Sequence, residues 1–267
     1  MFTFPPSKWV GGILYEHGHR LIASSVGFLT IILAVWLWRS EPRRWMKWLG
    51  VGALGAVIAQ GVLGGLTVMF FLPASISTAH AGLAEIFFCL TVAIALFTSP
   101  GWIRAYNGHV IDDGALRKFA TTTTVLIYCQ ILIGATMRHT GAGLAIPDFP
   151  LMFGHLWPTH WDPKIAVHFA HRVGALLVAI SILATAFAVF QRTTLAELRR
   201  PAMLLTFLVA VQVTLGALTV LSGRDVWINS VHVVCGALVL TTSLVLTLRT
   251  WRASFATPAP VTRSAAA

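Results

Sequence analysis

Charged residues are scarce in this chain of 267 residues: they make up 10% of it, whereas hydrophobic residues make up 57%. Soluble domains usually carry about 25% charged residues, so the composition excludes an ordinary soluble fold. Acidic residues are the rarer kind, and the formal net charge is +10. This surplus does not indicate nucleic-acid binding, because the basic residues lie in short segments between apolar runs, where they orient membrane helices.

Cysteine is rare as well. Cys89, Cys129 and Cys235 each lie inside an apolar run, and none belongs to a CxxC pair. Disulfide frameworks and structural zinc sites need paired or closely spaced cysteines, so neither is expected. The three cysteines are interpreted as small buried residues.

Long apolar runs are the main feature of the sequence. Runs such as 51–71 and 231–248 contain no charged residue, and about 20 such residues cross a hydrocarbon core as a helix. The runs are continuous rather than alternating, which favours helices over a membrane barrel. The sequence therefore predicts an all-α polytopic membrane protein with seven visible spans, at about 17–39, 46–71, 77–98, 118–138, 165–190, 200–221 and 228–250.

The connections between the spans alternate in charge. Six basic residues belong to one side, and the other side holds thirteen: Arg39, Arg43, Arg44, Lys47, Arg104, Arg117, Lys118, Arg192, Arg199, Arg200, Arg249, Arg252 and Arg263. The positive-inside rule places the thirteen in the cytoplasm, together with a disordered tail at 251–267. We therefore expect a multi-pass protein of the cell (inner) membrane with its N-terminus outside. Residues 1–16 contain neither a signal peptide nor a span.

The sequence repeats itself at a shift of 152 residues. Glu16-x-x-His19-Arg20 aligns with His168-x-x-His171-Arg172, Gln60-x-x-Leu63-Gly64 aligns with Gln212-x-x-Leu215-Gly216, and His80 aligns with His232. Matched His, Arg and Gln residues in one ungapped register indicate a duplication. We therefore predict two helical half-bundles related by a pseudo-twofold axis.

The two halves differ in length. The second half, 118–250, has four predicted helices, whereas the first half, 1–99, has three, and a cytoplasmic linker at 100–117 joins them. The counterpart of helix 118–138 would fall before Met1. Eight spans are expected if that helix precedes the sequence given, and an N-terminal helix is thus interpreted as missing.

His19, His80, His171 and His232 are predicted near the outer ends of alternate helices. Ionisable groups within spans are costly and tend to face the interior of a bundle. Two facing helices per half would offer two imidazoles to one metal. Heme iron needs two axial ligands, whereas zinc needs three or four protein ligands. The pattern therefore favours two hemes over zinc.

The neighbours of these histidines suggest further roles. Glu16 stands where the second half has His168, and a carboxylate beside a heme pocket is suited to proton transfer or to stabilising positive charge. Arg20 and Arg172 are candidates for pairing with heme propionates, and interaction with lipid headgroups is an equal alternative. Gly61 and Gly65 are predicted to allow close helix packing. The Gly- and Pro-punctuated loop after residue 139 is predicted to cover the outer pockets.

Several motifs together resemble heme A synthase. They are Glu16-His17-Gly18-His19-Arg20, Met137-Arg138-His139-Thr140-Gly141-Ala142-Gly143, Pro147-Asp148-Phe149-Pro150 and the His-Arg and single-His pairs of both halves. The resemblance implies an eight-helix protein of terminal oxidase assembly that oxidises the C8 methyl of heme O to the formyl group of heme A, in successive two-electron steps. It covers the chain apart from the absent first helix, and the cysteine pair found in the first outer loop of some members is also absent.

The resemblance also implies roles for single residues. His19 and His80 would ligate the substrate heme O, with Glu16 as the catalytic carboxylate. His171 and His232 would ligate a resident heme b that relays electrons. Heme O synthase is an expected partner besides the lipid bilayer, a homo-oligomer is an open option, and the electron partner is not identified.

Two other functions fit the same residues. One is a di-heme b-type electron-transfer cytochrome with two permanent hemes, and the other is a heme transporter or chaperone. The difference between Glu16 and His168 favours the enzyme, because two fully matched pockets would be expected of the cytochrome.

Overall fold

The computed structural model describes residues 12–70, 73–104 and 113–252, and its regular structure there is helical apart from one isolated bridge between Met152 and His155. The helices are α1 (Gly12–Ser40), α2 (Arg44–Met69), α3 (Ala74–Thr98), α4 (Pro100–Arg104), α5 (Gly114–His139), α6 (Pro163–Arg192), α7 (Ala196–Leu221) and α8 (Val226–Thr250). All except the short α4 are long and apolar enough to cross a membrane. The prediction of an all-α polytopic membrane protein is confirmed.

Aspartate caps explain why three helices begin earlier than their apolar runs. Asp113 accepts hydrogen bonds from the backbone N–H groups of Ala115 and Leu116, which starts α5 at 114 rather than 118. Asp162 and Asp225 cap α6 and α8 in the same way. Such a cap supplies acceptors for the free N–H groups of the first turn. The predicted linker at 100–117 is correspondingly shorter and contains α4.

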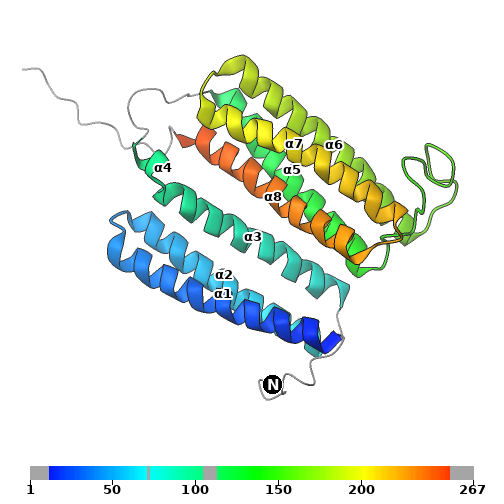
Figure 1. Ribbon diagram of the computed structural model, residues 1–267, viewed down its shortest axis with the longest axis horizontal. Coiled ribbons are helices and arrows are strands. Elements are labelled where there is room, and N and C mark those ends of the chain that lie inside the picture. The colour runs from blue at the N-terminus through cyan, green and yellow to red at the C-terminus, as the bar shows by residue number, and fades with distance from the viewer. Residues whose placement is uncertain (1–11, 71–72, 105–112, 253–267) are drawn as a thin grey trace, which may run out of the picture.

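The second half closes into a four-helix bundle, and the first half stays open. Helix α5 packs on α6 and α8, α6 packs on α7, and α7 packs on α8. In the first half α1 packs on α2, and α2 packs on α3. Helix α3 also packs on α5 and α8, so it lies between the two halves (Figure 1). In the described residues, no helix takes the place beside α1 and α3 that α5 takes beside α6 and α8.

The two ends of the bundle differ in character. His19, His80, His171 and His232 lie about 9–12 Å along their helices from the same end, which we call the histidine end. The opposite end, which carries most of the thirteen basic residues, we call the basic end. The buried core of the first half lies toward the basic end and comprises Leu37, Met46, Ala53, Ala93, Ile94, Phe97 and Trp102. No residue of this core lies at the histidine end of the first half.

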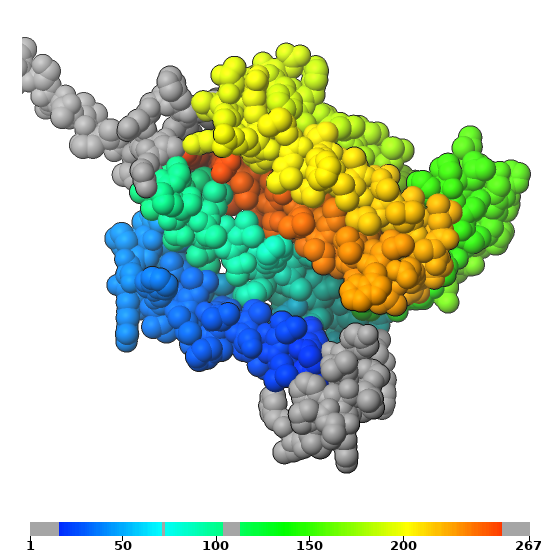
Figure 2. Space-filling view, viewed as in Figure 1, coloured from blue at the N-terminus to red at the C-terminus, as the bar shows by residue number. Residues whose placement is uncertain are grey.

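Arg252 joins the two halves at the basic end. Its guanidinium forms an ion pair with Glu197 at the start of α7 (3.2 Å) and donates to the carbonyl of Trp102 in α4. The side chain is 8% exposed. The described residues thus include the first two of the predicted tail, and 253–267 lies outside the described residues. The space-filling view shows α1 and α2 on one side of α3 and the second half on the other (Figure 2).

Candidate functional site

The four histidines lie in two groups. His19 of α1 lies near His80 of α3, and His232 of α8 lies near His171 of α6. His139 is a further neighbour of His80, and His168 is a further neighbour of His171. In the part of the chain that the structure describes, no group of three or more His, Cys, Asp or Glu side chains could hold a metal ion. Two histidines per site suit the axial positions of heme iron and fall short of a zinc site.

Glycines provide the space in which three of these imidazoles lie. A Cβ atom added to Gly64 of α2 would lie 3.3 Å from Cε1 of His80, and one added to Gly216 of α7 would lie 3.2 Å from Cε1 of His232. The repeat matches Gly64 with Gly216. Gly134 of α5 is tighter, because its added Cβ would lie 2.9 Å from Cε1 of His171. The rings of His80, His171 and His232 therefore pack against the backbone of the helix that precedes their own in the chain.

Glutamines accompany the same histidines. Gln60 donates to the backbone carbonyl of His80 (2.9 Å), and Gln130 donates to that of His171 (2.7 Å). The Nε2 atom of Gln212 lies 3.5 Å from Nε2 of His232. Each of these contacts joins two neighbouring helices: Gln60 links α2 to α3, Gln130 links α5 to α6, and Gln212 links α7 to α8.

Several polar atoms beside the histidines are buried without a partner. They are Nδ1 of His80 and His232 and Oε1 of Gln60, Gln130 and Gln212. Buried polar atoms normally have a hydrogen-bond partner. An imidazole that binds iron through one nitrogen carries its proton on the other and needs an acceptor nearby. The amide atoms that face the rings are donors, however: Nε2 of Gln130 lies 2.9 Å from Nδ1 of His171, and Nε2 of Gln212 lies 3.5 Å from Nε2 of His232. The fit of the two pockets to a heme rests instead on the two histidines of each half and on the unpartnered Nδ1 atoms of His80 and His232.

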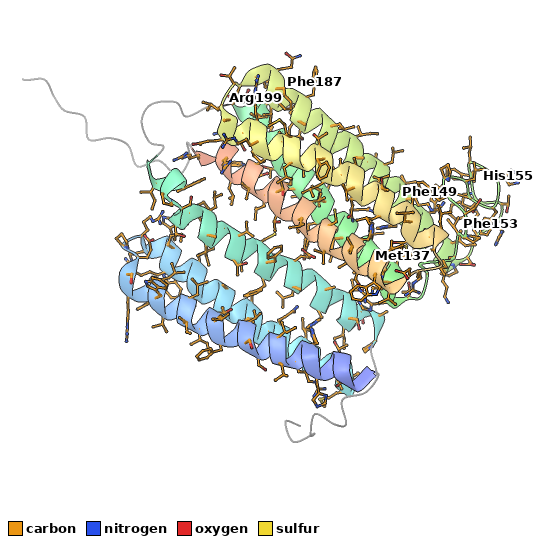
Figure 3. The ribbon with its side chains drawn as sticks, viewed as in Figure 1. Met137, Phe149, Phe153, His155, Phe187 and Arg199 are labelled. Atoms are coloured by element: carbon orange, nitrogen blue, oxygen red, sulfur yellow. The ribbon has the colours of Figure 1, made fainter. Side chains whose placement is uncertain are left out.

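The segment between α5 and α6 is tied down over the second half by two side chains of α6. Arg172 donates to the carbonyls of Ile146 (3.1 Å), Asp148 (2.6 Å) and Leu151 (2.9 Å). His168 is 2% exposed, and its Nδ1 accepts the N–H of Ile146 (3.2 Å). Figure 3 shows Phe149, Phe153 and His155 of this segment beyond the helix ends, near Met137. The prediction of a covering loop agrees with these anchors.

The pairing of Arg172 with a heme propionate or a lipid headgroup stays a prediction. In this structure three of its N–H groups donate to loop carbonyls, and Nε lies 3.2 Å from Nε2 of His168. The sequence could not show this, because the loop carbonyls that it binds are set by the fold.

The corresponding positions of the first half are occupied by an ion pair. Arg20 donates to Oε1 of Glu16, four residues before it on α1, just as Arg172 lies four residues after His168. The Glu16 side chain is 53% exposed, and His19 is exposed too. Glu16 and Arg20 are therefore accessible at the histidine end, whereas their second-half counterparts hold a loop.

Comparison with known proteins identifies the family of the chain. The sequence profile of the COX15-CtaA family, described as a cytochrome oxidase assembly protein, matches residues 9–244. The chain belongs to this family.

Relatives in the family carry a more specific name. The heme A synthase of Symbiobacterium thermophilum is 30% identical over 222 residues, which are 81% of this chain and 72% of the relative. That of Halalkalibacterium halodurans is 28% identical over 242 residues, covering 86% and 77% of the two chains. That of Nitrosomonas eutropha is 30% identical over 260 residues, covering 89% and 71%. The resemblance to heme A synthase seen in the sequence motifs is confirmed.

The packing of His171 against Gly134 gives a test of the second pocket. Replacing Gly134 by alanine should displace the imidazole, because the new Cβ would lie 2.9 Å from Cε1, closer than such atoms approach. We expect a reduced content of b-type heme and a shifted absorbance spectrum in the purified variant. Gly65→Ala is the matched control, because an added Cβ there meets nothing within 4 Å. Equal spectra from both variants would contradict the assignment.

The covering loop should loosen in acid. The N–H groups of Gly154 and Phe153 hold the pKa of Asp148 below its usual value, and the nearby Arg172 adds to this. A lowered folded-state pKa stabilises the loop fully above the ordinary aspartate value of about 4. That contribution is lost as the pH falls through the lower folded-state pKa. Asp148→Ala should therefore raise backbone amide exchange at Phe153 and Gly154 at neutral pH, and exchange unchanged from wild type would rule this out.

Two aspects of the site were not foreseen in the sequence. Gly61 and Gly65 were predicted to allow close packing, but an added Cβ meets nothing at either position, and the close approach is at Gly64. Glu85 of α3 was not singled out, although it is an acidic residue inside a predicted span, and such residues are rare. In the repeat Glu85 aligns with Ala237, and this mismatch could have identified it from the sequence.

Proposed function

We propose that the two halves divide the heme A synthase reaction between a substrate site in the first half and an electron-accepting site in the second. The reaction itself follows from the family: the protein is an oxidoreductase that oxidises a methyl group of heme O to the formyl group of heme A. The observation that carries the division is that Glu16 and His168, at matched positions, differ in accessibility and in what they bind.

In the substrate site, His19 and His80 hold the iron of heme O from α1 and α3. The two side chains interact electrostatically, and Gly64 makes room for the His80 ring. Glu16 lies three residues before His19, on the same face of α1. Arg20 donates to its carboxylate and so fixes the orientation of the side chain. Arg20 is in addition the candidate partner of a heme propionate.

Glu16 then acts as the catalytic carboxylate. With water as the source of oxygen, each of the two oxidations adds one hydroxyl group and releases two protons and two electrons, giving first an alcohol and then a hydrated aldehyde. Loss of water from the hydrate gives the formyl group. A carboxylate held at the edge of the pocket accepts such a proton. Its second-half counterpart, His168, is buried under the loop and bound to Ile146, so it is not available for this chemistry.

In the second half, His171 and His232 hold a resident heme b. The fit rests on Gly134 and Gly216 beside the two rings and on the unpartnered Nδ1 of His232. When bound, a heme b supplies a one-electron redox centre. Gln130 orients the His171 ring, because its Nε2 lies 2.9 Å from Nδ1 and donates to the backbone carbonyl of the same residue. The loop held by Arg172 limits access of water to the pocket.

The orientation in the membrane follows from charge. The basic end carries most of the arginine and lysine residues, so it faces the cytoplasm and the histidine end faces the outside of the cell membrane. Arg138, Lys164, Arg172 and Arg224 are the basic residues near the histidine end of the second half.

Pigment analysis tests the proposal. The protein is expressed in a membrane that contains heme O, and the hemes are extracted and identified by mass. Heme A is expected, together with a b-type heme that copurifies with the protein. A protein that keeps two b-type hemes and forms no alcohol or aldehyde heme would instead be a di-heme cytochrome.

A further inference from the structure

Glu85 lies near the middle of α3, about 16 Å along the helix from its first residue. The neighbouring residues Ala84, Ile86 and Phe87 are apolar. A carboxylate at this depth is expensive to bury, and ionisable residues inside spans usually mark a path for protons, ions or substrates. The reaction site described above does not use it.

The other three glutamates of the chain each pair with an arginine. Glu16 pairs with Arg20, Glu41 with Arg43, and Glu197 with Arg252. Glu85, in contrast, forms no ion pair within the described residues. Its Oε2 atom is buried and has no hydrogen-bond partner. The side chain therefore does not serve as a structural ion pair.

Glu85 lies on the side of α3 that meets the second half. Gly82, one turn earlier, faces α5, because the hydroxyl of Tyr128 donates to its carbonyl (3.3 Å). Glu85 lies near Tyr128 and near Cys89, one turn later. Cys129 of α5 is a further titratable group near Tyr128. His80 is five residues away, which is about 140° around the helix, so Glu85 faces away from the His80 ring.

The repeat gives Glu85 no counterpart. The matched residue of the second half is Ala237, and Cys89 is matched by Thr241. A residue needed only for packing in both halves would be expected to recur, as Gln60 and Gly64 do. Glu85 thus lies at the contact between the two halves. In the proposed function, electrons pass across this contact from the first half to the second.

We propose that Glu85 is a proton-exchange group at the boundary of the two halves. When one electron enters the redox centre of the second half, the Glu85 carboxylate takes up one proton, and it releases the proton when the electron leaves. Each hydrogen removed from the substrate methyl supplies one proton and one electron, so charge balances at each transfer. The uptake cancels a charge that would otherwise be added in a region of low dielectric constant. This inference rests on the proposed function.

Infrared difference spectroscopy of the purified protein with heme b bound, reduced minus oxidised, tests the inference. The wild type should show a carboxylic-acid carbonyl band, and Glu85→Gln should lack it. The midpoint potential of the heme should fall with rising pH by up to about 59 mV per tenfold change in proton activity for one proton per electron, and this dependence should flatten in Glu85→Gln. Glu85→Asp should restore the pH dependence and show a carboxylic-acid band at a shifted frequency, and Cys89→Ala should leave both signals as in the wild type.

The outcomes separate the two proposals. An unchanged band and an unchanged pH dependence in Glu85→Gln, in a protein that forms heme A, would overturn the role of Glu85 and leave the function intact. A wild type that binds heme b and forms no heme A would overturn the function, and the infrared band would still report on Glu85. If Glu85→Gln does not accumulate, Glu85→Asp serves in its place, and a band at the wild-type frequency in that variant would contradict the inference.

Discussion

Replacing Glu16 by glutamine is expected to stop heme A formation while the content of b-type heme stays at the wild-type level. Glutamine keeps the size of the side chain and a hydrogen bond from Arg20, but it cannot accept a proton from the reacting group. Loss of a positioned general base typically costs a factor of about 10²–10⁴ in rate, which would reduce heme A below detection in cell extracts. The measurement is heme extraction with mass analysis, beside an absorbance spectrum of the purified protein.

Two further variants make this result specific. Glu197→Gln removes an acidic residue at the basic end and should leave heme A formation unchanged, because Glu197 contacts Arg252 and lies far from the histidines. Glu16→Asp keeps the carboxylate on a shorter side chain and should retain part of the activity. If Glu16→Gln made heme A at the wild-type rate, the catalytic role of Glu16 would be disproved, whatever the effect of the other variants.

The fold was largely predictable because its signals are strong and repeated. Apolar runs of about 20 residues specify membrane helices by length alone, so the seven spans agree with the structure apart from their ends. The ends depended on single caps: Asp113 starts α5 four residues before the predicted position. A capping aspartate in a polar segment resembles any other loop residue until its N–H partners are known.

The site was predictable where the repeat marked it and not where the fold alone creates it. The four histidines share one register, which identified them as pairs. Gly134 and Gln130 lie on α5, whose counterpart is not in the described first half, so no repeat pointed to them. Their roles appear only when α5 packs on α6 and brings both residues to His171.

Replacing either histidine of the second half by alanine should have the second large effect. Without His171 or His232 the heme b loses an axial ligand, so the b-type absorbance is expected to disappear from the purified protein, and heme A formation with it. His19→Ala and His80→Ala should give the complementary result, with the b-type absorbance retained and heme A lost. His155→Ala, in an exposed part of the loop (Figure 3), is the control and should preserve both signals.

The contrast between the two halves is the decisive part of this experiment. A di-heme cytochrome would lose about half of its b-type absorbance on removal of a ligand from either half, because both pockets would hold the same permanent cofactor. A synthase with one substrate site and one resident heme loses it only through the second half. Survival of the absorbance in both His171→Ala and His232→Ala would show that the resident heme is held elsewhere. In that case the glycines and glutamines beside these histidines would have to serve helix packing alone.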